Sequence, residues 1–374
     1  MYREQLNKDL TIDILSRLPV KSLTRFRCVR KSWYTLFSNP IFIFKHLNQS
    51  KNDASLFIKH RCCITQKHVI CLVSSSDSFD VLSSFEVPSE MYSKFMRIVG
   101  SCNGLLCITH DGVSNFDSPV FLWNPATREF RDLPKCIIET AHMPGERVCG
   151  VVYGFGYNPI IDDYKLVRIV YSYYFDRLYS RVEVFQLGDC FWREINAINC
   201  RIYESSCTMA NGILHWIAHG GGVNDCELVV SFDMGDEVFR QIILPDFDFV
   251  GNGICMRLAV FKESLSLITY TYRGRDKWFD IWVKNENSAK EVWTKQLTIG
   301  PVFGVERPLG CGMWGEVFME KSKGRLVWYD PTTQEIRDHS IHGVSCSLEV
   351  HVYVESLVSV YGRNEVVEVA DSII

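Results

Sequence analysis

The stretch Phe121–Pro134 reads FLWNPATREFRDLP, and it has the pattern of a strand, a polar turn and a second strand. An apolar run ends in an aromatic residue and Asn, a short turn follows, and apolar residues then resume. Four later stretches repeat this pattern: EVFQLGDCFWREI (183–195), VSFDMGDEVFRQIILP (230–245), DIWVKNENSAKEVWTKQLTI (280–299) and LVWYDPTTQEIRDHSI (326–341). Such repetition predicts an all-β domain built from similar small sheets.

The spacing of the repeats predicts the kind of domain. The aromatic residues that close the first strand are 62, 47, 50 and 47 residues apart, at Trp123, Phe185, Phe232, Trp282 and Tyr329. Periods of roughly 40 to 50 residues, with about four strands each, are typical of propeller blades. Residues 55–87 form an incomplete unit, and residues 348–360 resemble the first half of a blade. We expect the two ends to share one blade, which gives six blades; seven blades or a distorted sandwich are the alternatives.

The first 50 residues have a different pattern. From Asp13 to Phe37 they read DILSRLPVKSLTRFRCVRKSWYTLF, with apolar residues at helical spacing and Lys or Arg between them. Pro19 should end a first helix, Ser22 should cap a second, and a third and a short fourth should follow. Fifty residues cannot bury so many large side chains internally. Part of the apolar surface therefore faces a partner or, alternatively, packs on the rest of the chain.

Charge is distributed unevenly along the chain. Residues 1–50 contain nine Lys and Arg against three Asp and Glu, whereas the remainder contains 31 against 41, so that a basic head precedes an acidic body. This asymmetry predicts two different partners. No apolar run is long enough for a membrane span and the amino end does not resemble a signal peptide, so we expect the cytosol or nucleus and no membrane partner. The fifteen Cys are irregularly spaced, which favours reduced thiols over a disulfide or zinc framework.

The basic head resembles a known module. Leu6–Leu47 resembles an F-box, because ILSRLPVKSL, RFRCV and KSW occur in the order and spacing of that family. The resemblance implies docking on a Skp-family adaptor and, through it, on a cullin. One departure from the family pattern is Asn7 where a Pro usually follows the Leu. The adaptor contacts that the resemblance implies are Leu6, Leu10, Ile14, Leu15, Leu18, Pro19, Leu23, Phe26, Val29 and Trp33.

The body resembles the plant F-box-associated domain, also described as kelch-like. The matching segments are NGLLCI, LWNPATREFRDLP, GFGYNPIIDDYKLVRI, SFDMGDEVFRQIILP and IWVKNENSAKEVWTKQLTIGP. NFDSPVFLWNP and VYVESLVSV further resemble the S-locus F-box proteins. The resemblance implies a non-catalytic substrate-recognition subunit of an SCF-type (Skp-cullin-F-box) ubiquitin ligase, which promotes ubiquitination and proteasomal degradation of a protein target. In the S-locus group that target is a basic secreted ribonuclease, recognised in pollen self-incompatibility.

Stretches outside the repeats are candidates for target contact, since blade loops vary without disturbing the scaffold. The stretch Ser172–Arg181 reads SYYFDRLYSR and combines Tyr with Arg, a composition favoured at interface hot spots. The candidate target-binding residues are Tyr173, Tyr174, Phe175, Arg177 and Tyr179.

Two other function classes fit the sequence less well. A helix-turn-helix that binds nucleic acid is disfavoured, since basic and apolar residues alternate and Pro19 interrupts the helix. The alternative to the receptor interpretation is a hydrolase-like propeller enzyme with an incidental helical N-terminus, which would need clustered catalytic groups. His219–Gly222 matches an esterase oxyanion loop, but no G-x-S-x-G motif occurs, and a strand would place His215 and His219 too far apart for one metal. We therefore expect no catalytic residue, metal or cofactor, and no nucleic-acid partner.

The expected organisation is an α+β multidomain chain. A small all-α F-box domain (1–47) precedes a connector (48–54), an all-β propeller-like domain of six blades (55–362) and a C-terminal tail (363–374).

Overall fold

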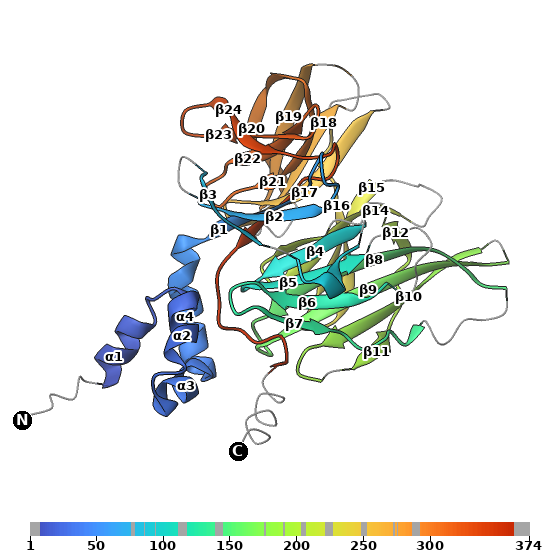
Figure 1. Cartoon of the computed structure of the whole chain (residues 1–374). Helices are drawn as coiled ribbons and strands as arrows, with labels where there is room; N and C mark the ends of the chain where they lie inside the picture. The colour runs from blue at the N-terminus through green and yellow to red at the C-terminus, as the bar shows by residue number, and fades with distance from the viewer. Residues whose placement is uncertain are drawn as a thin grey trace, which may run out of the picture.

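The structure, a computed structural model, describes residues 8–75, 79–85, 87–93, 95–110, 118–138, 145–175, 177–189, 191–202, 207–220, 227–247, 253–271, 274, 276–285 and 292–362. Helices come first, and strands arranged in six antiparallel sheets follow (Figure 1). The predicted all-α domain followed by a six-bladed propeller is confirmed. The predicted tail, 363–374, and the candidate Leu6 lie outside the described residues.

The amino-terminal helices form a unit that we call the helical head, residues 8–50. Its fourth helix begins at Pro40, and the Asn39 side chain caps it by accepting a hydrogen bond from the Ile41 N–H at 2.8 Å. The second helix begins at Val20, directly after Pro19, so the expectation that Ser22 caps it is wrong: Pro19 pre-sets the entry to the helix and no side chain caps it. The helices are α1 (Lys8–Leu15), α2 (Val20–Phe26), α3 (Lys31–Phe37) and α4 (Pro40–Ser50).

A small core holds the head together. Val20, Leu23 and Phe37 are fully buried, and the Phe37 and Phe42 ring centroids are 5.3 Å apart. The segment 48–54, which the sequence indicated as a connector, contains the last residues of α4 and the 3-10 turn η1 (Lys51–Asp53). The head therefore enters the propeller through continuous helical backbone.

Each of the six sheets is one blade of the propeller. Blade 1 contains β25 (Glu349–Tyr353), β1 (Ser55–Arg61), β2 (His68–Val73) and β3 (Val81–Phe85); blade 2 contains β4 (Met96–Cys102), β5 (Leu105–His110), β6 (Val120–Asn124) and β7 (Glu129–Asp132). Blade 3 contains β8 (Arg147–Asn158), β9 (Asp163–Tyr174), β10 (Arg177–Gln186) and β11 (Trp192–Ile195). Blade 4 contains β12 (Cys200–Ile202), β13 (Thr208–Ala210), β14 (Ile213–Gly220), β15 (Glu227–Asp233) and β16 (Val238–Ile243). Blade 5 contains β17 (Ile254–Phe261), β18 (Ser264–Thr271), β19 (Asp276–Asn285) and β20 (Val292–Phe303); blade 6 contains β21 (Val305–Cys311), β22 (Val317–Lys321), β23 (Arg325–Asp330) and β24 (Glu335–His342).

The repeated aromatic residues occupy equivalent places in their blades. All five lie on the third strand counted from the innermost, namely β6, β10, β15, β19 and β23. Three of them face another aromatic residue on the outer strand: Trp123 faces Phe130, Phe185 faces Trp192, and Phe232 faces Phe239. The repeat seen in the sequence is therefore the outer hairpin of each blade.

The last described strand, β25, closes the ring. Strand β25 pairs antiparallel with β1, from Ser55 opposite Tyr353 to Lys59 opposite Glu349. The two ends of the chain share blade 1, as expected. The carboxyl-terminal segment supplies only one strand, however, and not half a blade, because residues 354–362 leave the sheet and run toward the head.

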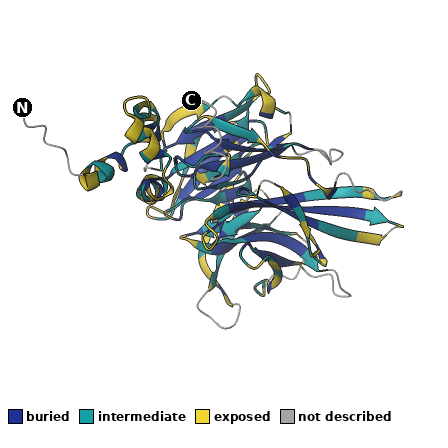
Figure 2. Ribbon diagram, turned by 90° about the horizontal axis from the view of Figure 1, so that it is seen from below, coloured by how far each residue is buried: buried dark blue, intermediate teal, exposed yellow. Residues whose placement is uncertain are grey.

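The core of the propeller lies between blades. Buried clusters fill the interfaces of blades 1 and 2, 2 and 3, 3 and 4, 4 and 5, 5 and 6, and 6 and 1. Between blades 3 and 4, the fully buried Trp216 donates its indole N–H to the Tyr153 carbonyl and packs over Gly154, where a Cβ would lie 2.4 Å from the ring. Figure 2 shows the resulting pattern of buried strands and partly exposed head helices.

Candidate functional site

The helical head packs on the face of the propeller where the innermost strands end. Leu357, four residues after the end of β25, is 2% exposed and belongs to the core of the head, and Ala126, in the turn after β6, packs against that core. The Asn124 amide donates to the carbonyls of Ser356 at 3.0 Å and Val358 at 2.8 Å. The carboxyl-terminal segment is thereby held between the head and blade 2.

The head exposes part of its apolar surface. Leu10, Ile14 and Val29 are 51%, 48% and 66% exposed, although each is a large hydrophobic side chain. The candidates Leu18, Phe26 and Trp33 are half-buried at the edge of the core, and Pro19 is exposed. Leu15 and Leu23 lie inside the core, where their side chains hold the head together and present no surface.

Sequence analysis missed three exposed residues of the head as candidate contacts. Ile41 is 79% exposed, Phe44 is 57% exposed and Tyr34 is 48% exposed. The signal was present, because residues 41–44 read IFIF and no helix buries four consecutive side chains against one neighbour. Phe42 faces the core, so Ile41 and Phe44 remain outside.

The head keeps a positive surface because its described carboxylates are few. The side chain of Asp13 bonds Lys45 of α4 and Arg17, each at 3.0 Å, and these two cations hold the pKa of Asp13 below its usual range. The pair with Lys45 ties α1 to α4. Other cations are exposed beside the apolar residues, namely Lys21, Arg25, Arg30 and Lys31.

The target-binding candidates lie at the tip of the hairpin formed by β9 and β10. This hairpin projects away from the head (Figure 1), and its tip is the turn after Tyr174 that contains Phe175. Phe175 is 82% exposed and its ring centroid lies 4.4 Å from that of Tyr174. Strands β9 and β10 contain 12 and 10 residues, so this hairpin is long, and its tip stays a candidate for target contact.

The register divides these candidates between two faces of the hairpin. Arg177 pairs with Tyr174 and Tyr179 pairs with Ser172, so Tyr174, Arg177 and Tyr179 share one face. Tyr173 pairs with Leu178 and lies on the other face. Burial and a hydrogen bond with Glu146 raise the pKa of Tyr179 to about 12, so this phenol stays neutral. The structure thus brings together four of the five candidates.

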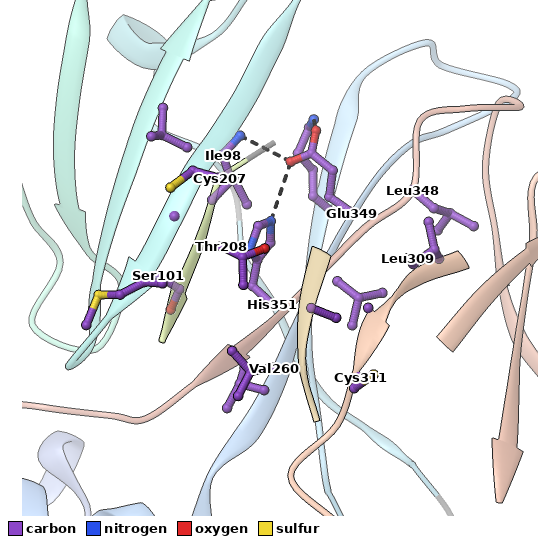
Figure 3. Close-up of a pocket in the computed structure, with 18 of the residues that line it drawn as sticks. Ile98, Ser101, Cys207, Thr208, Val260, Leu309, Cys311, Leu348, Glu349 and His351 are labelled. Atoms are coloured by element: carbon purple, nitrogen blue, oxygen red, sulfur yellow. Dashed lines mark hydrogen bonds and ion pairs between the residues drawn. The ribbon is translucent and has the colours of Figure 1, made fainter. Parts of the chain in front are cut away.

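The innermost strands surround a cavity of about 1080 Å³ along the propeller axis. Figure 3 shows its wall, with Ile98 of β4 beside Glu349 and His351 of β25. The Glu349 carboxylate accepts hydrogen bonds from the Ile98 N–H at 3.1 Å and the Lys59 ammonium at 2.5 Å. Burial opposes the charge, but Lys59 and His351 hold the pKa of Glu349 well below its usual range.

One described group near this cavity has the spacing of metal ligands: Glu306, Glu320 and Cys346. Glu320 is fully buried and its carboxylate already accepts from Arg307 at 2.7 Å and from the Cys346 N–H at 2.5 Å. The same carboxylate therefore neutralises an arginine, which accounts for its burial without a metal.

Comparison with known families decides the identity of both parts. Residues 56–360 match the family described as F-box associated beta propeller domain, and residues 4–45 match the F-box domain. The chain is an F-box protein of the F-box associated propeller family. Its helical head is the F-box, and its F-box and propeller together span nearly the whole sequence.

Curated relatives cover the same length. The F-box/kelch-repeat protein At3g23880 of Arabidopsis thaliana is 28% identical over 358 residues, which are 93% of each chain. F-box protein CPR1 of the same plant is 28% identical over 385 residues, covering 94% of this chain and 88% of the relative. Among solved structures, TolB from Acinetobacter baumannii aligns with 84% of this chain and 73% of its own, at a TM-score of 0.49 and 8% identity, too weak a likeness to bear on function. Of the described helices, none has the length and apolar character to cross a membrane.

Proposed function

We propose that this F-box protein is the substrate receptor of an SCF-type ubiquitin ligase. The F-box binds a Skp-family adaptor and through it a cullin, while the propeller binds a protein target. The associated ligase carries out ubiquitin transfer, and this chain contributes proximity between the target and that machinery. Ubiquitination and proteasomal degradation of the target would follow.

The observation that supports adaptor binding most strongly is the exposed apolar surface of the F-box. Val29 and Ile41 are both more than 60% exposed, and burying such a side chain contributes roughly 1.5–3 kcal/mol. The exposed cations beside them suit an acidic partner surface. Of the sequence candidates, Leu10, Ile14, Pro19 and Val29 are therefore the most accessible, with Leu18, Phe26 and Trp33 at the edge.

We expect Val29→Asp combined with Ile41→Asp to weaken adaptor binding by about 30-fold or more, because two apolar contacts would become desolvated charges. Both side chains point to solvent in the free protein, so folding should be unaffected. Binding of the purified chain to a Skp-family adaptor would be measured by calorimetry. The control is Ile64→Asp, which changes an isoleucine of the propeller that is 91% exposed. Unchanged binding by the folded double variant would refute the adaptor surface.

For the target we propose the β9–β10 tip as a contact. We expect a variant with Tyr174→Ala, Phe175→Ala and Arg177→Ala to keep the wild-type unfolding midpoint, because these side chains lie at an exposed tip. Target ubiquitination in a reconstituted ligase should fall at least tenfold. The control is Ile160→Ala, an 84% exposed residue in the turn between β8 and β9. Equal ubiquitination by both variants would show that the target binds another part of the propeller.

A basic secreted ribonuclease is the target that the S-locus resemblance suggests. The acidic composition of residues 51–374 supports such a partner, since opposite charge steers association. Binding to a purified basic ribonuclease should then weaken as salt rises from 0.05 to 0.5 M, values that bracket the physiological screening range. No binding at low salt would exclude the ribonuclease and leave the receptor function standing.

A further inference from the structure

The wall of the axial cavity is basic, although the chain as a whole is acidic. Seven Lys and Arg line the cavity against two carboxylates, whereas the full chain has 40 against 44. The lining cations are Lys51, Lys59, Arg61, Arg97, Arg257, Lys262 and Arg307, and the lining carboxylates are Glu263 and Glu349.

Three hydrogen bonds link charged side chains of the cavity wall to the innermost strand of the next blade. They place these side chains at a similar height along the propeller axis. The Arg257 Nε of β17 donates to the Leu309 carbonyl of β21 at 3.1 Å. The Arg307 Nη2 of β21 donates to the carbonyl of Leu348 at 3.0 Å, and Leu348 directly precedes β25. Glu349 of β25 accepts from the Ile98 N–H of β4 at 3.1 Å. The contacts step through blades 5, 6, 1 and 2, and Arg97 is the neighbour of Ile98.

These residues lie at the mouth of the cavity opposite the F-box. Arg97, Arg257 and Arg307 all belong to the first half of their innermost strands. The F-box packs instead beyond the ends of β25 and β6, through Leu357 and Ala126. Strand β1 runs antiparallel to β25, so Lys59 and Arg61 at its end reach the same mouth. We call Lys59, Arg61, Arg97, Arg257 and Arg307 the basic mouth.

Two cations of the basic mouth pair with buried or half-buried carboxylates, whereas Arg61 pairs with no described carboxylate. Glu349 pairs with Lys59 at 2.5 Å, and the buried Glu320 pairs with Arg307 at 2.7 Å. Arg61 has no ion pair in the described part of the chain, and its Nε is buried without a hydrogen-bond partner there. A buried donor without an acceptor is costly, which favours an external acceptor.

We propose that the basic mouth binds a small polyanion, a ligand that carries two or more phosphate or carboxylate groups. Arg recognises such groups in a bidentate manner, and a cavity walled by protein focuses the positive field. The volume of about 1080 Å³ is slightly above the usual range of small-molecule sites, roughly 300–1,000 Å³, so a ligand with several anionic groups fits. The polyanion is either a free small molecule or acidic and phosphorylated side chains of a bound target. With a free small molecule as its ligand the site goes beyond the proposed function, and with target side chains as its ligand it rests on that function and deepens it.

The test uses the full chain bound to its adaptor, with inorganic tripolyphosphate as the probe. Calorimetry should show saturable binding, and the unfolding temperature should rise with probe concentration relative to sodium chloride at equal ionic strength. We expect Arg61→Gln to weaken binding at least tenfold, since the other contacts of Arg61 are made by its backbone. The matched control is Arg240→Gln on the outer strand β16, where an exposed arginine is replaced and affinity should not change.

The outcomes separate the possibilities. No binding beyond the sodium chloride control, or equal affinity in Arg61→Gln and Arg240→Gln, would overturn the site and leave the arginines as links between strands. Competition by an eight-residue peptide with two phosphoserines would support the site and identify target side chains as its ligand. Binding of tripolyphosphate that the peptide does not displace would support a free small molecule. Adaptor affinity, measured on the same variants, reports the proposed function independently.

Discussion

Replacing Glu183 with glutamine is expected to lower the free energy of unfolding by about 3–5 kcal/mol, the cost of leaving a buried charge uncompensated. Glu183 of β10 and Arg168 of β9 are 0% and 1% exposed, and their charged atoms are 2.5 Å apart. The second carboxylate oxygen accepts from the N–H groups of Ile137 and Ile138 at 3.0 and 3.2 Å. Because donors face both oxygens, a glutamine would turn its own NH₂ toward a donor in either orientation.

Urea unfolding followed by tryptophan fluorescence measures this change. The control is Glu194→Gln on β11, because Glu194 pairs with Arg181 at 2.8 Å but the two side chains are 43% and 22% exposed. An exposed pair of this kind contributes less than about 1 kcal/mol. Equal midpoint shifts in the two variants would contradict the role assigned to the buried pair.

The largest effect is expected from removal of the last strand. A chain that ends at Ser347 lacks β25, so β1 loses its inner partner and Lys59 loses the Glu349 carboxylate. The apolar side chains of Leu56 and Ile58 would no longer be enclosed at the interface of blades 6 and 1. We expect a protease to cleave this shorter chain under conditions in which the full chain stays intact. We also expect copies of the shorter chain to self-associate through the open edge of blade 1.

A chain that ends at Gly362 is the matched control, because it keeps every described strand and the segment that contacts the F-box. Adding a synthetic peptide of residues 345–362 to the shorter chain should restore protease resistance, since strand addition re-forms the ladder with β1. Protease resistance of the shorter chain without the peptide would show that ring closure is dispensable.

The sequence predicted the fold well because its repeat has a simple physical cause. Trp123 and its counterparts occupy the same strand of each blade and fill the same kind of interface, so their spacing reports the blade count. Blade 4 could not be predicted in detail, because β12 and β13 both pair with β14 and no pattern marks the split. The capping role given to Ser22 failed because Pro19 already directs the chain into α2.

The candidate surfaces were predictable to different extents. The hairpin tip was found by its departure from the repeat, but only the register shows that Tyr173 faces away from Tyr174. The basic mouth was not predicted, because Arg97, Arg257 and Arg307 are far apart in sequence and line one cavity only when the ring closes. The net charge of residues 51–374 gives no sign of this basic site, because acidic residues outnumber basic ones over that range.

Closure by the last strand also has a consequence for biosynthesis. The F-box and β1–β3 leave the ribosome before β4–β24, and β25 and Leu357 emerge after all of these strands. At roughly 5–20 residues per second, blade 1 stays open for on the order of ten to fifty seconds. During that time the core of the F-box lacks Leu357 and the edge of β1 has no partner. A nascent chain that has not yet released β25 therefore exposes the edge of β1, and only a chain that includes β25 and Leu357 presents a complete F-box core on a closed ring.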